Sequence, residues 1–262
     1  MDKTIQTLPQ TELHLPDIHR VEAMRPFQWL AAGGRDLRRA PATGLLYGAL
    51  FALLGYGLYS VSEGAPNFVM TYVAGFFLVG PFLATGLYAV AHRLEHHQPA
   101  HLGHALSAWH RSGLQMGIYA AMLGFLMVFW IRLAWLMIGL AFQQGGALGF
   151  SDMTNAASGG AFGLSYLALY LVLGAAFAAL VFAISVIALP MLQDRRVDIV
   201  TAMLTSLKAV RLNPGAMIVW AALIVGLTLI GFATLLLGLV VTFPLLAFAT
   251  WHAYRDLIPR QH

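Results

Sequence analysis

Long uncharged stretches alternate with short charged segments along the chain. A membrane-spanning helix needs about 20 predominantly apolar residues. Three intervals between charged residues each have room for one such helix, and these are 39–63, 63–93 and 111–132. The pattern therefore predicts three crossings in the first half of the chain.

The second half has two longer uncharged intervals. The interval 152–194 begins with a polar, glycine-rich segment, so it predicts one loop and one crossing near 162–189. The interval 211–255 has room for two crossings joined by a turn near Gly231 to Gly238. The whole pattern predicts an all-α, polytopic membrane protein with six transmembrane helices.

An internal repeat divides this predicted bundle into three units. Arg38 aligns with Arg211 and Pro41 with Pro214 at a constant offset, and a third copy places Arg111 at the same position. Prolines in the returning segments support the alignment. We expect a polar cytoplasmic tail over 1–25, then a single transmembrane domain over 26–262, built from three pseudo-repeats at about 26–98, 99–193 and 194–262.

Each pseudo-repeat is expected to begin with a cytoplasmic interfacial amphipathic helix. In the first copy, Phe27, Leu30, Ala31 and Gly34 fall on one helical face, which should lie on the membrane surface. A proline or glycine then breaks the helix so that the chain can turn into the membrane. The three aligned arginines are expected to bind lipid phosphates or to cap helix carbonyls, and these are Arg38, Arg111 and Arg211.

Composition supports a membrane protein and excludes several other classes. The chain is 59% hydrophobic and 10% charged, with a mean hydropathy of +0.73, whereas about a quarter of residues are charged in soluble domains. Cysteine is absent, which excludes thiolate metal sites. Of the 15 Lys and Arg residues, all but Arg132 fall on one side of the predicted bundle. Because basic loops stay cytoplasmic, we expect the bacterial inner membrane, with both termini cytoplasmic and with anionic lipid head groups, not nucleic acid, as partners.

Six of the ten histidines lie between 92 and 110. His92, His96 and His97 form an H-x-x-x-H-H motif that resembles one histidine box of the membrane fatty-acid desaturases and hydroxylases. Those enzymes carry several such boxes, and only one is present here. We expect a solvated loop, while the candidate metal ligands are His92, His96, His97, His101 and His104. A b-type heme held between His92 and His252 is a further alternative.

The predicted spans are almost free of charged residues at their centres, which argues against a proton- or sodium-coupled carrier. They contain small residues instead, among them Gly44, Gly48, Gly55, Gly117 and Gly226. Small residues let helices pack closely in membranes. A lipid-accommodating groove between the repeats remains an alternative use of these positions.

The segments R-P-F-Q-W-L at 25–30 and D-L-x-x-x-P at 36–41, with the Y-G and G-L-Y that follow, resemble a proteobacterial family of predicted six-span membrane proteins that carries a domain-of-unknown-function label. The helix-then-hairpin repeat is more loosely similar to the membrane domain of some glycerophosphodiester phosphodiesterases. The resemblance implies structural motifs, with no catalytic residue and no cofactor.

We therefore expect a non-enzymatic accessory, assembly or lipid-interacting membrane protein, with another membrane protein complex as a candidate partner. Two alternatives come from other classes. One is a metal- or heme-using oxidoreductase, or a subunit associated with a respiratory oxidase, and the other is a transporter or lipid-handling protein.

The one-sided distribution of Lys and Arg gives a topology that can be tested. Alkaline phosphatase fused after residue 103 or 203 should be inactive, because both sites are expected in the cytoplasm. Fusions near Glu63 and Asp152 should be active. Activity at 103 or 203 would overturn the predicted orientation.

Overall fold

The computed structural model describes residues 15–64, 69–100, 102–105, 113–142 and 161–260. Within these ranges the chain is helical, with no strand, so the predicted all-α class is confirmed. The helices are α1 (Arg25–Arg39), α2 (Pro41–Gly64), α3 (Val69–Glu95), α5 (Gly113–Phe142), α7 (Ala161–Ser185), α8 (Ala188–Asp194), α9 (Ile199–Leu212), α10 (Pro214–Ala233) and α11 (Leu239–Leu257).

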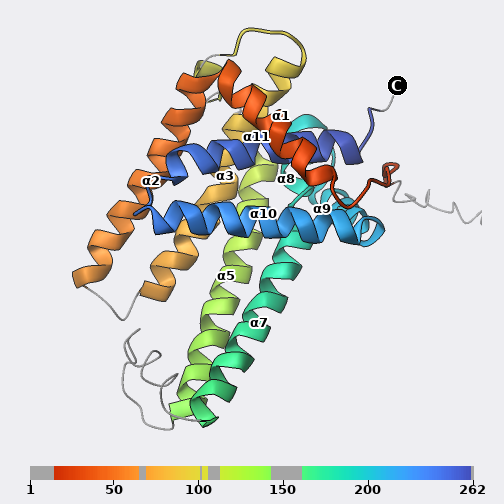
Figure 1. The fold of residues 1–262 in the computed structure, drawn as a ribbon. Coiled ribbons are helices and arrows are strands. Elements are labelled where there is room, and N and C mark those ends of the chain that lie inside the picture. The colour runs from red at the N-terminus through yellow and green to blue at the C-terminus, as the bar shows by residue number, and fades with distance from the viewer. Residues whose placement is uncertain (1–14, 65–68, 101, 106–112, 143–160, 261–262) are drawn as a thin grey trace, which may run out of the picture.

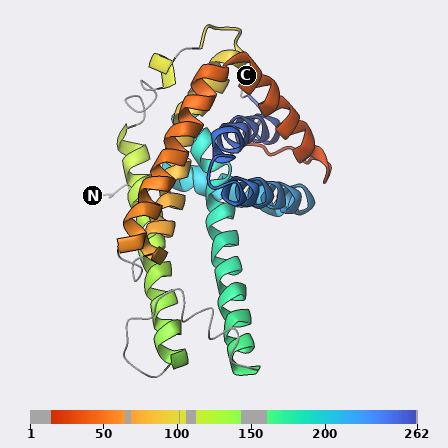
Figure 2. The same ribbon diagram turned by 60° about the vertical axis from the view of Figure 1, so that its left-hand side comes forward.

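The long helices form two sets with different directions. The axes of α2, α3, α5 and α7 are broadly aligned, whereas α10 and α11 lie crosswise to α5 and α7 (Figures 1 and 2). Helix α11 packs against α1, α2, α3, α8 and α10, so it joins the two sets.

Four helical segments are long and apolar enough to cross a membrane, judged by length and composition within the described ranges. They are Pro41–Val61, Leu114–Met137, Ala168–Asp194 and Pro214–Ala233. These segments correspond to four of the six predicted crossings. Helices α3 and α11 are not among the candidate spans found in the described residues, so the six-span topology stays a prediction.

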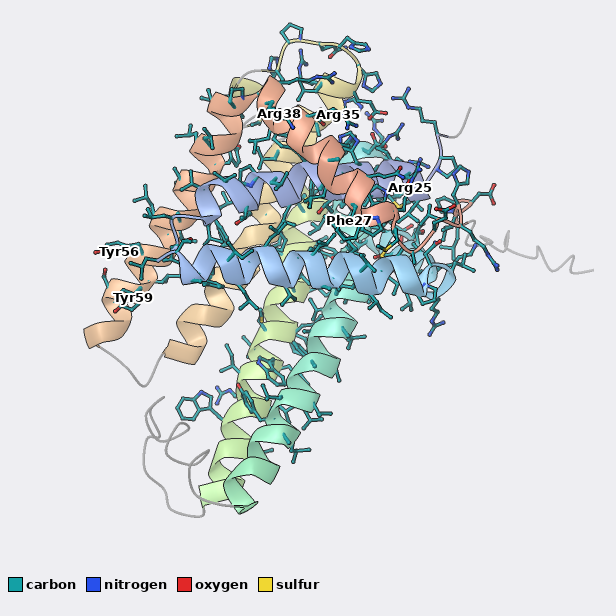
Figure 3. The ribbon with its side chains drawn as sticks, in the orientation of Figure 1. Arg25, Phe27, Arg35, Arg38, Tyr56 and Tyr59 are labelled. Atoms are coloured by element: carbon teal, nitrogen blue, oxygen red, sulfur yellow. The ribbon has the colours of Figure 1, made fainter. Side chains whose placement is uncertain are left out.

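Side chains on these four segments place their apolar surface outward. Val172 is 65% exposed, Phe125 71% and Ile218 70%. In water such surface would promote association, but lipid solvates it. Figure 3 shows Arg35 and Arg38 near one end of α2 and Tyr56 and Tyr59 at its other end. Tyrosine is typical of a membrane–water interface.

The same helix-break-helix geometry occurs twice. Ala40, between α1 and α2, has φ −129° and ψ 57°, and Asn213, between α9 and α10, has φ −129° and ψ 50°. Their N–H groups donate to Asp36 O and Ala209 O, which are aligned positions. The proline that follows each break disfavours a helical conformation at the preceding residue. The third copy, around Arg111, lies outside the described residues, so the threefold repeat stays a prediction.

Helices α1 and α9 bury faces that differ from the apolar stripes expected from the sequence. Helix α1 buries Trp29, Gly33 and Asp36, while Phe27 is 49% exposed. Helix α9 likewise buries Thr205 and Ser206. Small or polar residues with specific partners therefore make the contacts of α1 and α9 with the rest of the fold. The apolar stripe of α1 faces the outside of the protein. The expected contact of this stripe with the membrane surface stays a prediction.

Close helix packing is confirmed at the predicted Gly48, is found also at Gly33, and is absent at the predicted Gly117 and Gly226. A Cβ at Gly33 would lie 2.6 Å from Ala249 N, and one at Gly48 would overlap the carbonyl group of Val240. Both contacts are to the backbone of α11. At Gly117 and Gly226 a Cβ would meet no described atom within 4 Å.

The segment before α1 is partly integrated into the fold. His19 N donates to Leu257 O at 2.9 Å, and Val21 N donates to Asn213 Oδ1 at 2.8 Å. Asn213 Nδ2 donates back to His19 O at 3.1 Å. Residues 15–24 thus attach to the turn between α9 and α10, whereas 1–14 of the predicted tail lie outside the described residues.

Replacing Gly48 by Val should destabilise the protein, because the side chain would push α2 away from the α11 backbone. Overpacking of this kind costs about 1–3 kcal/mol. Gly57→Val on the same helix is the matched control, since a Cβ there meets nothing within 4 Å. Thermal unfolding in detergent measures both, and equal midpoints would contradict the close approach.

Candidate functional site

Three helices bring charged side chains together at one end of the protein, which we call the polar end. Arg255 of α11 donates from Nε to Glu95 Oε1 of α3 and from NH1 to Asp194 Oδ2 of α8, each at 3.2 Å. The side chain of Arg255 is only 14% exposed. A charge that is mostly buried needs such partners, so Arg255 ties the ends of α3, α8 and α11 to one another.

Aromatic side chains complete this network. Tyr254 donates its hydroxyl to Asp194 Oδ2 at 2.6 Å and accepts from Arg195 Nε at 2.9 Å. Trp251 Nε1 donates to Glu95 Oε2 at 3.2 Å. Trp251 and Tyr254 are fully buried, so their polar groups must find partners inside the fold.

A second set of polar contacts fixes α1 to α11. Asp256 accepts from Arg25 Nε and Trp29 Nε1 at 2.7 and 2.8 Å. His252 Nε2 lies 2.7 Å from Asp36 Oδ2, and Asp36 is buried. Burial alone would raise the pKa of Asp256, but the hydrogen bonds from Arg25 and Trp29 outweigh it and lower that pKa below its ordinary value.

The histidine motif does not form one helical face. Helix α3 ends at Glu95, and His97 has a φ of 53°, a left-handed conformation that takes it off the helix. His92 and His96 remain neighbours, with ring centroids 4.5 Å apart. Burial lowers the pKa of His92. His104 lies in the short described segment 102–105, while His101 and His110 lie outside the described residues.

The candidate metal ligands do not converge within the described part of the chain. No group of three or more His, Asp or Glu side chains there could hold a metal ion. His92 Nε2 lies 3.6 Å from Asp194 Oδ1, whereas His252 faces Asp36. A heme held between His92 and His252 would require both of these contacts to break.

The aligned arginines lie at helix ends. Arg38 is exposed and its Nε lies 3.3 Å from Gly34 O, a carbonyl near the end of its own helix. Arg211 is exposed in the last turn of α9. Arg111 lies outside the described residues. A role at lipid phosphates stays a prediction for all three.

An apolar groove of about 570 Å³ lies between the two sets of helices. Side chains of α2, α3, α5, α7, α10 and α11 line it, among them Phe51, Met127, Trp130, Ala178 and Ile224. Thr242 also lines the groove, and among the described residues its buried hydroxyl has no hydrogen-bond partner. The groove can hold an apolar chain that carries a polar atom near Thr242.

Sequence analysis missed the carboxylates and aromatics of the polar end. Asp194 entered only as the end of an uncharged interval, and Glu95 and Asp256 were given no role. Their spacing shows no motif, because their partners lie on other helices. The sequence does offer one signal for these carboxylates. Each of them lies at or near the end of a segment that contains a proline, and the three segment ends come together in the fold.

The apolar outer surface, the four long apolar helices and the polar end define an integral membrane protein of helical class. Residues 69–194, just under half of the chain, match a family described as predicted integral membrane protein, domain of unknown function DUF2189. Comparison with curated proteins and with solved structures gave no match. The expected proteobacterial origin and the looser similarity to glycerophosphodiester phosphodiesterases remain untested.

Replacing Asp256 by Asn should lower the unfolding midpoint at neutral pH, since hydrogen bonds to a charged group contribute about 1.5–3 kcal/mol. Because the folded state lowers this pKa, its contribution is present above the unfolded pKa of about 4 and is lost as pH falls through the folded value. Asp256→Asn should therefore show a smaller loss of stability on acidification than the unaltered protein.

Asp17→Asn is the matched control, because Asp17 is exposed. Its melting profile between neutral and acidic pH should match that of the unaltered protein. Identical profiles for the Asp256→Asn and Asp17→Asn variants would contradict the role of the contact between α1 and α11.

Proposed function

We propose that this protein is a non-enzymatic, lipid-interacting component of the bacterial inner membrane, and that the apolar groove binds the acyl chain of a phospholipid. The groove is the observation that carries the proposal. Its volume of about 570 Å³ lies within the range of small-molecule sites, about 300–1,000 Å³. Its lining is almost entirely apolar.

The surroundings of the groove favour a lipid over other apolar ligands. Two of its walls, α5 and α7, are candidate membrane spans with apolar outer surfaces. Acyl chains are therefore the most abundant apolar groups next to its walls. The unpaired hydroxyl of Thr242 fits the same class of ligand, because an ester carbonyl of a phospholipid can accept its hydrogen bond.

The proposal includes the topology expected from charge, with both termini cytoplasmic, six crossings and three pseudo-repeats. Four of the six crossings are supported by helices that are long and apolar enough to span a bilayer. The proposed partners are anionic lipids and another membrane protein complex.

Filling the groove should prevent acyl-chain binding. Ala178 lines the groove on α7 and the neighbouring Ala179 does not, although both are exposed. A phospholipid with a photoactivatable acyl chain should cross-link to groove residues such as Met127 and Ile224 in the unaltered protein. Ala178→Phe should reduce this labelling about tenfold, given an overpacking cost of about 1–3 kcal/mol.

Ala179→Phe is the matched control and should leave the labelling of groove residues unchanged. Peptide mass spectrometry identifies the labelled sites in each variant. Equal labelling in both variants, or labelling spread over outer residues such as Leu169 and Val172, would refute the groove as a lipid site.

A further inference from the structure

A second cavity, of about 430 Å³, lies at the polar end and has a different character. We call it the basic pocket. It is lined by His92, His96, Asp194, Arg195, Arg196, Val197, Arg255 and Arg260. Four of these eight residues are arginines, which come from the end of α11, the segment after it and the segment after α8.

Carboxylates balance only part of this positive charge. Asp194 lines the pocket and bonds to Arg255, and Glu95 bonds to Arg255 and Arg260. Two carboxylates thus face four guanidinium groups. A cavity with walls of one prevailing sign concentrates ions of the opposite sign, so the pocket favours an anionic ligand.

Three of the arginines are held in place before any ligand binds. Arg195 donates to Tyr254 Oη and to the carbonyls of Ile258 and Pro259. Arg255 is held by Glu95 and Asp194, and Arg260 NH2 by Glu95 at 2.8 Å. Fixing these side chains in advance reduces the entropy that a ligand would otherwise lose on binding.

Each of these three arginines keeps donor capacity. Among the described residues, the NH1 atoms of Arg195 and Arg260 and the NH2 atom of Arg255 have no hydrogen-bond partner. Arg196 is exposed and also has no hydrogen bond or ion pair within that part of the chain. Several guanidinium donors around one cavity match the oxygens of a phosphate group, which arginine binds in a bidentate manner.

We propose that the basic pocket is a phosphate-binding site, which takes a phosphomonoester or phosphodiester group through Arg195, Arg196, Arg255 and Arg260. The phosphate can belong to a lipid head group or to a soluble molecule. The site does not depend on the proposed acyl-chain groove, because the two cavities share no lining residue.

The test uses the full chain purified in a neutral detergent. Inorganic phosphate, glycerol 3-phosphate and dihexanoyl phosphatidic acid are titrated, and dihexanoyl phosphatidylcholine serves as the zwitterionic comparison. Isothermal titration calorimetry measures affinity at low and at high salt. Binding should weaken as salt rises, because salt screens partly exposed charges.

Arg196→Gln with Arg260→Gln removes two partly exposed cations from the pocket. Arg20→Gln with Arg35→Gln is the matched control, since both arginines are exposed and lie outside the pocket. The pocket variant should lose about tenfold or more in phosphate affinity, and the control less than about twofold. Should the pocket variant fold poorly by circular dichroism and size-exclusion chromatography, Arg196→Gln alone is used, with Arg20→Gln as its control.

The ligands then distinguish the two sources of phosphate. Tighter binding of phosphatidic acid than of glycerol 3-phosphate assigns the site to a lipid head group, whereas equal binding assigns it to a soluble phosphate. Ala178→Phe, which fills the groove, should leave the affinity for glycerol 3-phosphate unchanged, so failure of either proposal can be recognised separately. The pocket proposal is overturned if no phosphate compound binds, or if the pocket and control variants lose affinity equally.

Discussion

The contact of α11 with the helices around it is the interaction on which the rest of the structure depends. Within a bilayer, helices gain little from the hydrophobic effect, so close packing and polar links must hold them together. Helix α11 provides both. Gly33 and Gly48 let α1 and α2 approach its backbone. Asp36 and Asp194 bond to side chains in its last two turns, and its own Asp256 bonds to Arg25 of α1.

This arrangement explains why the polar contacts gather at one end. A charged side chain at the centre of a bilayer is costly, whereas charged pairs near the membrane surface keep partial access to water. The links from α11 to α1, α3 and α8 all lie between Trp251 and Asp256. The remainder of α11 packs through apolar contacts and glycine. The polar contacts and the close packing contacts of α11 therefore lie on different parts of this helix.

Features that depend on local sequence could be predicted. The apolar intervals indicated six crossings, and four of them coincide with candidate spans in the described residues. Pro41 and Pro214 indicated two helix breaks whose backbone angles agree closely. Features that depend on distant partners could not. The buried face of α1 is set by the α11 backbone against Gly33. Glu95 bonds to Trp251, Arg255 and Arg260, which lie far along the chain. A periodic apolar stripe indicates which face of a helix can contact lipid. It does not indicate which polar side chains bond to one another.

The order of residues along three helices separates the two candidate sites. On α3, Tyr88 lines the groove and His92 the basic pocket, with the buried Val90 and Ala91 between them. The same order holds on α8, where Met191 and Leu192 are buried between Leu189 and Asp194, and on α11, where Trp251 and Tyr254 are buried between Thr250 and Arg255. A closely packed layer thus divides the cavities, and packed interiors leave few voids as large as a water molecule. One lipid cannot pass its chain through this layer from pocket to groove. The proposed acyl-chain and phosphate sites therefore occupy separate cavities of the fold.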